Sequence, residues 1–163
     1  NNNKVVKCPN VVDPPLRLVY GGNTGGYGYN RYTYEASYGP PPDYPLIIRP
    51  KRMADFPITS GTVLFAESAF LADYGGWHIE EAVMVTGPQA FLGSNVGWGY
   101  YLTLTQFRHS GGAANIAFLD GHVEAMRDVG PPTPAGWDSQ VDAMRRKHLL
   151  GFPFATESPY SGQ

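Results

Sequence analysis

The segment from Phe107 to Met126 reads FRHSGGAANIAFLDGHVEAM, and the expected fold is built around it. Just before it, Tyr101–Phe107 alternates apolar and polar residues, the pattern of a half-buried β-strand. Ser110-Gly111-Gly112 then interrupts the pattern, because glycine adopts the positive φ angles that tight turns need. Residues 115–119 and 122–126 resume as short strands around Asp120-Gly121, a second turn pair. The sequence therefore predicts a three-stranded antiparallel meander over residues 101–126.

The hairpin contains three side chains that could either bind a metal ion or serve a structural role. His109, Asp120 and His122 are candidate metal ligands, because imidazole and carboxylate bind zinc and similar ions. Alternatively, Asp120 caps the turn, His109 forms a hydrogen bond across the hairpin and His122 lies on the surface. The second interpretation is preferred, since no other cluster of acidic, histidine or cysteine residues reinforces a metal site. We therefore expect no metal and no cofactor.

This hairpin resembles the prepilin-type processing-associated family, bacterial envelope proteins named for His, nine residues and then Asp-Gly. The residues that match the family pattern are Arg108, His109, Gly111, Asn115, Phe118, Asp120, Gly121, His122 and Val123. Ten residues separate His109 from Asp120 here, so the additional one, assigned to Ala113-Ala114, is expected to lengthen the turn or form a bulge. Looser similarity covers Lys7-Cys8-Pro9, residues 26–30, residues 48–50 and residues 62–67.

The resemblance implies a pilin-like fold, with a long N-terminal helix followed by a β-rich globular part. No segment of this chain predicts such a helix, so either it lies upstream or the protein is held in place in another way. The expected fold class is α+β, predominantly antiparallel β with long Gly/Pro/Tyr-rich loops and one C-terminal helix. One domain is expected over residues 1–163.

Composition narrows the functional classes. The net charge is −2 and 16% of residues are charged, which argues against a nucleic-acid partner, because that requires a basic face. No apolar run approaches the ~18 residues of a membrane-spanning helix. Twenty glycines, fifteen prolines and eleven tyrosines favour a loop-rich β protein outside the cell. Cys8 is the only cysteine, so no disulfide forms within the chain; a buried free thiol is favoured over pairing between chains.

Aromatic residues supply the candidate contact surfaces. Tyrosines 27, 29, 32, 34 and 38 lie in a Tyr/Gly tract, where they either bind sugars or a neighbouring subunit, or else cover the flank of the sheet. Residues 68–99 read as a long excursion that includes a strand or short helix at 80–85. Within this segment, Trp77, Phe91 and Trp98 are candidates for contacts with a partner subunit. Alternatively, they cover an open end of the sheet. The interface candidates are Val5, Val6, Tyr27, Tyr29, Tyr32, Trp77, Phe91 and Trp98.

Other elements follow from local signals. Gly61–Glu67 is expected to be a strand buried on both faces, with Glu67 paired to Arg49 or Arg52, and residues 49–55 to include a helical turn. A helix is expected from Asp138 or Ser139 to a stop at Gly151, with Val141, Met144, Leu149 and Leu150 as its apolar stripe and Arg145, Arg146 and Lys147 near its end. Phe152 and Phe154 are expected to dock on the core, and the tail 157–163 to be exposed.

These observations predict a non-catalytic structural subunit of an extracellular or cell-surface filament, pilus or pseudopilus, with copies of itself as partners. The strand expected at Lys4–Cys8 is a candidate for addition to a neighbour's sheet. The alternative is a carbohydrate-binding module that uses the exposed aromatic residues. A metal-dependent hydrolase using His109, Asp120 and His122 is the third hypothesis, and no established catalytic motif supports it.

Overall fold

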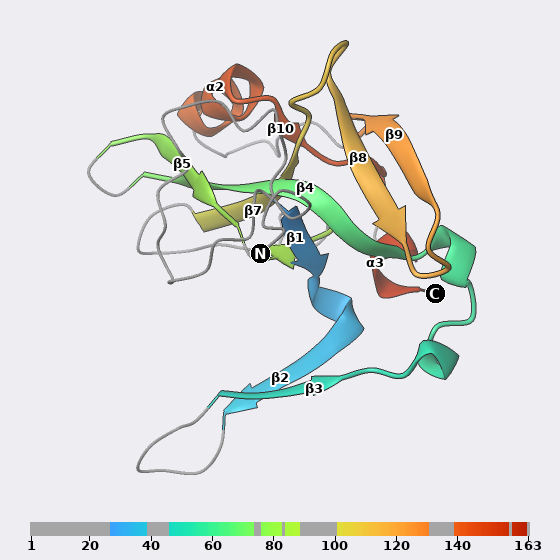
Figure 1. Cartoon of the computed structure of the whole chain (residues 1–163). Coiled ribbons are helices and arrows are strands. Elements are labelled where there is room, and N and C mark those ends of the chain that lie inside the picture. The colour runs from blue at the N-terminus through green and yellow to red at the C-terminus, as the bar shows by residue number, and fades with distance from the viewer. Residues whose placement is uncertain are drawn as a thin grey trace, which may run out of the picture.

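The fold is built on one mixed sheet with short helices around it (Figure 1). The computed structural model describes residues 27–38, 46–73, 76–82, 84–88, 101–130, 139–156 and 158–162. Within them, the main sheet has eight strands: β1 (Tyr27–Asn30), β4 (Val63–Ala72), β5 (His78–Glu81), β6 (Met84–Val85), β7 (Tyr101–Gln106), β8 (Ala113–Phe118), β9 (Val123–Arg127) and β10 (Leu150–Gly151). The expected α+β class with mainly β structure is thus confirmed.

Strand β4 organises the main sheet, because four other strands pair with it. Its first half lies between β1 and β8, and its second half lies between β5 and β7, all antiparallel. Strand β9 extends the sheet beyond β8, β10 extends it beyond β7, and β6 pairs parallel to β1. The prediction of a strand after Gly61 is confirmed, although β4 begins at Val63 and continues to Ala72.

The predicted three-stranded meander is wrong in its pairing. The strand segments and both turns are present, but β7 and β8 pair with different halves of β4 instead of with each other. Of the three strands in the predicted meander, only β8 and β9 pair with each other, continuously from Ala113↔Arg127 to Ala117↔Val123. The additional residue therefore makes no bulge in this ladder; the register shift lies in β4, between Val63 and Phe65.

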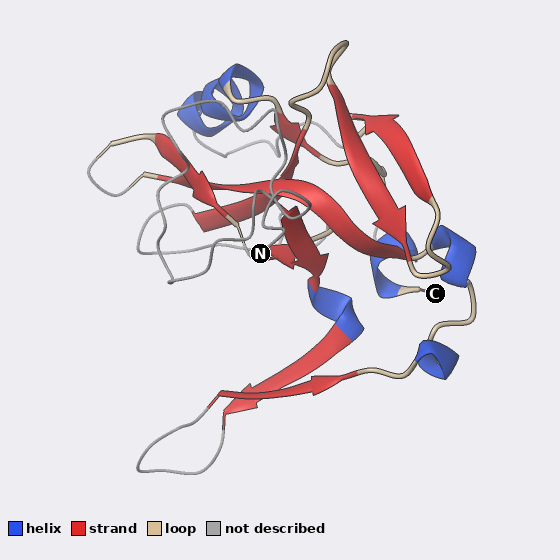
Figure 2. Ribbon diagram, in the orientation of Figure 1, coloured by secondary structure: helices blue, strands red, loops and turns tan. Residues whose placement is uncertain are grey.

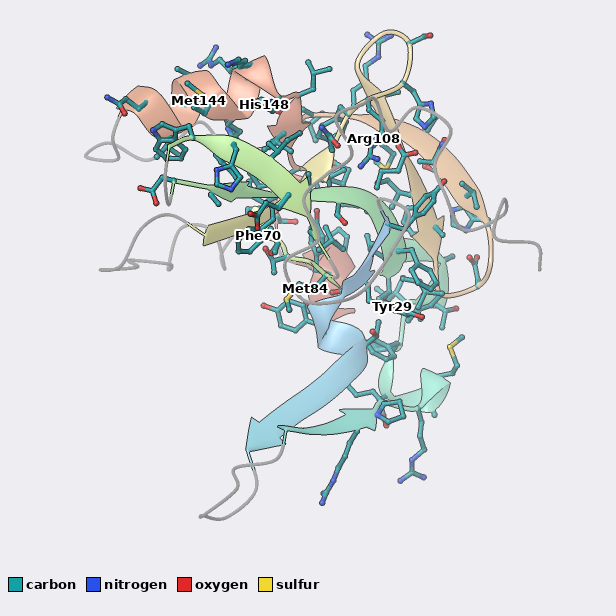
Figure 3. The ribbon with its side chains drawn as sticks, turned by 60° about the vertical axis from the view of Figure 1, so that its left-hand side comes forward. Tyr29, Phe70, Met84, Arg108, Met144 and His148 are labelled. Carbon is teal, nitrogen blue, oxygen red and sulfur yellow. The ribbon has the colours of Figure 1, made fainter. Side chains whose placement is uncertain are left out.

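The core consists of two apolar clusters on opposite faces of β4. One contains Ala66 with Ile116 and Phe118 of β8, and the other contains Ala69 and Leu71 with Val141 of the helix α2 (Ser139–Lys147). Because successive residues of a strand point to opposite faces, Ala66 lies on the face opposite to Ala69 and Leu71. Phe70 shares the face of Ala66 because it lies four residues further along the strand. In Figure 3, Phe70 and Met144 of α2 accordingly lie on opposite sides of the strands. Burial of β4 on both faces, as the sequence predicts, follows from this arrangement.

The described part of the expected excursion, residues 68–73, 76–82 and 84–88, is more regular than predicted, and residues 89–99 lie outside the described residues. Residues 68–72 continue β4, and the chain turns back as β5, which pairs with the same half of β4. Of the two alternatives for residues 80–85, the strand is confirmed by β5 and β6. Trp77 is partly buried against the Leu71 cluster, and its Nε1 donates to Gln140 Oε1 at 3.1 Å. This part of the chain therefore completes the sheet.

Helix α2 (Ser139–Lys147) confirms the expected C-terminal helix, with two corrections. Val141 and Met144 face the core and Arg145, Arg146 and Lys147 stand in its last turn, as expected. Leu149, however, is exposed and has a φ of 55°, so the helix has already ended before it. Gly151 belongs to β10, where a side chain would collide with the Asp128 carboxylate, so it is not the helix stop.

The chain end contradicts the prediction of an exposed tail. Residues Ser158–Ser161 form a second helix, α3, and Tyr160 is completely buried in the cluster around Ala66 and Ile116. Asn30 fixes this helix, because its Nδ2 donates to the carbonyls of Val63 at 2.8 Å and Tyr160 at 2.7 Å. Phe152 is buried and Phe154 packs against the same cluster as Tyr160, as expected.

A separate two-stranded ribbon stands away from the main sheet (Figures 1 and 2). It consists of β2 (Tyr34–Tyr38) and β3 (Leu46–Pro50), antiparallel, and follows β1 through the short helix η1 (Arg31–Thr33). The backbone bond from Lys51 N–H to Thr33 O closes its base at 3.0 Å. Two more turns of 3-10 helix, η2 (Met53–Asp55) and η3 (Thr59–Gly61), lead from β3 into β4, and η2 confirms the turn expected over residues 49–55.

Several predictions concern parts of the chain outside the described residues. They include the strand at Lys4–Cys8, the state of Cys8 and a helix start at Asp138. Among the helices of the described residues, none has the length and apolar character needed to cross a membrane.

Candidate functional site at the His109 hairpin

The turn before β8 positions the most distinctive side chains of the hairpin. Gly111 and Gly112 have φ angles of 76° and 69°, which lets the chain reverse within three residues. The His109 N–H donates to Ala113 O at 2.9 Å, and the Gly112 N–H donates to His109 O at 3.0 Å. This tight turn holds the backbone of His109 beside β8 and directs its ring over β4. The glycines that the sequence assigns to a turn are thus the reason for His109's position.

His109 pairs with Glu67 of β4. Its Nε2 lies 2.6 Å from Glu67 Oε1, and the other carboxylate oxygen accepts the Asn115 N–H at 3.0 Å. The Glu67 side chain is completely buried, whereas 25% of the His109 side chain is exposed. A buried carboxylate is costly unless donors satisfy it, so His109 and Asn115 together allow Glu67 to stay inside. The cluster Glu67–His109–Asn115 therefore ties the hairpin to the central strand.

The other end of the hairpin carries a second, exposed cluster. Asp120 Oδ1 lies 2.6 Å from His122 Nδ1 and accepts the His122 N–H at 3.2 Å, which is the predicted cap of the turn. The His122 Nε2 lies 3.4 Å from Glu124 Oε1, and the ring stacks on Phe118 with centroids 4.3 Å apart. The hydrogen bond from the His122 side chain lowers the pKa of Asp120 below its ordinary value of 3.8.

The structure does not bring the three candidate ligands together. His109 precedes β8 and Asp120 and His122 follow it, so the six residues of that strand separate them by roughly 20 Å. Across the described residues, no group of three or more His, Cys, Asp or Glu side chains is arranged to hold a metal ion. In the preferred interpretation, Asp120 caps the turn as predicted, while His109 bonds to β4 as well as across its own turn.

The tyrosines of the described tract lie in regular structure rather than in a loop. Tyr27 and Tyr29 belong to β1, and Tyr32 packs against the Ala66 cluster from η1. Tyr29 is 53% exposed, and its ring lies 4.3 Å from that of Phe65. Of the other interface candidates, Trp77 packs against the Leu71 cluster. Val5, Val6, Phe91 and Trp98 lie outside the described residues.

An apolar row crosses the sheet next to the Glu67–His109–Asn115 cluster. Pairing of the strands places one residue from each of five neighbouring strands on one face: Met84, Tyr29, Phe65, Ala117 and Val123. We call these residues the apolar stripe. Its two large exposed members are Tyr29 and Val123, with 53% and 61% of their surface open, and the others are partly buried. The stripe is therefore an exposed apolar surface of the hairpin region.

Two features of the site were not expected from sequence. Glu67 was assigned to Arg49 or Arg52, but both arginines are exposed, whereas the buried Glu67 pairs with His109, 42 residues away. The second is His78, whose Nε2 lies 2.8 Å from Oε1 of the buried Glu80. Residues two positions apart in a strand point to the same face. The sequence spacing of His78 and Glu80 could therefore have predicted this second histidine–glutamate pair.

The chain was also compared with known proteins, and no protein-family model, curated protein or solved structure matches it.

Proposed function

We propose that this protein is a structural, non-catalytic subunit of an extracellular filament or of a pilus-like or pseudopilus-like assembly, with copies of itself as partners. The resemblance of the Phe107–Met126 segment to the processing-associated envelope family is the first support. The second is the use of the motif residues within the fold. His109 holds the hairpin onto Glu67, and Asp120 caps its turn, so both act in internal architecture.

The observation that carries the proposal is the outer strand of the same hairpin. Within the described residues, β9 pairs only with β8, so its other edge presents backbone donors and acceptors. Four of its five residues are exposed. An open strand edge is a template for an added strand from another chain, and such pairing gives a directional contact between subunits. The segment Lys4–Cys8 of a neighbouring copy is the strand that we expect to add there.

Electron microscopy with a deletion variant tests this assignment. The purified chain should form filaments in negative stain, because each copy offers both an edge and a strand to fill it. Deletion of residues 1–9 should abolish the filaments while leaving the circular dichroism spectrum and melting of the folded domain unchanged. Filaments that persist in the deletion variant would refute strand addition, and wild-type protein without any filament would refute the structural role.

A carbohydrate-binding surface is the second candidate, favoured by the exposed ring of Tyr29 beside Phe65. Aromatic faces on a sheet provide stacking platforms for sugars. If this function holds, a glycan array should show binding that is lost in Tyr29→Ala and retained in Tyr29→Phe, which keeps the ring. Equal binding by both variants, or none by the wild type, would exclude Tyr29 as a sugar platform.

A further inference from the structure

Strand β5 begins with a histidine whose two ring nitrogens both face oxygen atoms. His78 Nδ1 lies 2.6 Å from the carbonyl oxygen of Gly76, and His78 Nε2 lies 2.8 Å from Glu80 Oε1. The Glu80 side chain is completely buried, whereas 29% of the His78 side chain is exposed. The pair therefore connects a buried carboxyl group to a ring that exchanges protons with water.

This arrangement holds one proton more than a neutral histidine beside an ionised glutamate. A carbonyl oxygen only accepts hydrogen bonds, so His78 Nδ1 carries a hydrogen and donates it to Gly76. In a neutral imidazole the second nitrogen is then an acceptor, and an ionised carboxylate is also only an acceptor. A hydrogen bond between Nε2 and Glu80 Oε1 consequently requires one further proton, either on the ring or on the carboxyl group.

We propose that His78 and Glu80 keep this shared proton in the folded protein at neutral pH, and that its release at higher pH detaches β5 from β4. A histidine in an unfolded chain releases its proton near pH 6.5. Above that pH the folded pair holds more protons than the unfolded chain does. The stabilisation is therefore present at lower pH and is lost as the pH rises and the pair releases its proton to water.

Strand β5 is the element that depends most directly on this proton. His78 and Glu80 are two of its four residues, and within the described residues β5 pairs with β4 alone (Figure 1). Once the proton has left, the ring keeps only one N–H, so one of its two hydrogen bonds is lost. Because a short strand at the side of a sheet can open locally, we expect β5 to open while the rest of the main sheet stays folded.

The neighbouring groups leave the pair as the group that titrates in this range. Within the described residues, the side chains that β4 presents on the face of the pair do not titrate; they are Ser68, Phe70 and Ala72. Asp73 follows β4 directly, and Tyr101 of β7 stands opposite Ala72 in the register. Aspartate and tyrosine ordinarily titrate near pH 3.9 and 10, outside the range from about 6.5 to 9. The charged residues of α2 belong to a helix that packs on the opposite face, against Leu71.

Nitrogen NMR of the histidine rings tests for the shared proton directly. Through-bond correlation to the backbone assigns the ring of His78, so the result depends on the wild-type protein alone. At about pH 7.5 both ring nitrogens should be close to a proton, with chemical shifts unlike those of an unprotonated nitrogen, whereas a histidine in an unfolded chain is then about nine-tenths neutral. A His78 ring with one clearly unprotonated nitrogen at this pH would overturn the proposal.

Hydrogen exchange, corrected for the intrinsic exchange rate, tests the release of β5. In the wild type, protection of the β5 amides should fall at least tenfold between about pH 6.5 and 8.5, while protection of the β8 amides stays constant. In Glu80→Gln the new side-chain amide can donate to Nε2 of a neutral ring, so protection of β5 should not change with pH. His122→Gln removes an exposed histidine–carboxylate pair and should behave as the wild type does.

Three results of the exchange experiment would overturn the proposal. The first is wild-type protection of β5 that is the same at both pH values. The second is an equal fall in β8, which would mean that the whole sheet opens. The third is a pH dependence in Glu80→Gln as large as in the wild type, or its loss in His122→Gln, because either would assign the titration to another group.

Discussion

At the scale of single residues, the buried side chain of Glu67 in β4 connects the central strand to the turn that precedes β8. Its oxygens are in contact with the ring of His109 and accept hydrogen bonds from the backbone and the side chain of Asn115, so removing the ring takes one partner from a buried carboxyl group. The other histidine of the hairpin, His122, pairs with exposed carboxylates in water. His109 and His122 thus differ in the burial of their carboxyl partners. Replacing each histidine in turn therefore compares a buried partner with an exposed one.

We predict that His109→Ala lowers the free energy of unfolding by about 2–3 kcal/mol, because it leaves the buried Glu67 underbonded. His122→Ala should cost less than about 1 kcal/mol, since its ion pairs are exposed. Urea denaturation of both variants measures the difference. Equal losses, or no loss in His109→Ala, would contradict the architectural role of the Glu67–His109 pair.

The acid titration of Asp120 gives a second prediction at this scale. The hydrogen bond from His122 lowers the pKa of Asp120, so the ionised form is favoured in the folded state. The resulting stabilisation is present at pH values above the ordinary pKa of 3.8 and is lost as the pH falls through the folded value. Carbon-detected NMR should show a carboxyl midpoint below 3.8 that rises in His122→Ala. A wild-type midpoint at or above 3.8 would show that the bond is absent in solution.

At the scale of elements, the junction of β1, β4 and β6 depends on the absence of a side chain at Gly28. A Cβ at this position would lie 2.5 Å from Ser68 Oγ and 2.6 Å from the Met84 carbonyl carbon, and the latter belongs to the backbone. We therefore expect Gly28→Ala to destabilise the protein by about 1–3 kcal/mol through overpacking.

Gly61→Ala is the control for Gly28→Ala. Its Cβ would meet only the Cγ2 atom of Ile58 at 3.0 Å, and Ile58 is exposed and free to shift. Its expected cost in thermal or chemical denaturation is under about 1 kcal/mol. If the two variants melt alike, the close approach of β1, β4 and β6 is not maintained in solution.

Helix α3 is the other element whose role a single residue can test. The Tyr160 ring is buried with Ala66 and Ile116, and the Tyr160 carbonyl accepts a bond from Asn30. Tyr160→Ala should cost about 3–5 kcal/mol, the range for truncating a buried aromatic side chain. Ser161→Ala, on the same short helix but only weakly bonded, should remain within about 0.5 kcal/mol of the wild type in urea denaturation. A small loss in Tyr160→Ala would mean that α3 is detached.

At the scale of the whole molecule, local patterns predicted the elements well. Alternation in Tyr101–Phe107, the glycine pair at 111–112 and the charges at the end of α2 each have a local physical cause. The pairing of the strands was harder to predict from the sequence. Alternation of apolar and polar residues tells which face of a sheet a residue occupies, but not which strand lies beside it. The insertion of β4 between β7 and β8 therefore could not be predicted, and neither could the Glu67–His109 bond that depends on it.

The chain end shows a related limit. Tyr160 stands among serine, proline and glycine, so local composition predicts an exposed tail. Its burial is explained by partners distant in sequence, above all Asn30, which is 130 residues away. Long-range burial of a single aromatic residue leaves no periodic signal in so short a segment.

Our central proposal is that copies of this chain associate with one another. Its support among the described residues is the outer edge of β9, which pairs there with no strand other than β8, and the exposed apolar stripe. Sedimentation velocity of the wild-type chain over a hundredfold concentration range is the most direct test. We predict that the weight-average sedimentation coefficient rises steadily with concentration as open-ended oligomers form. A single species with the sedimentation coefficient of a monomer at every concentration would contradict the account.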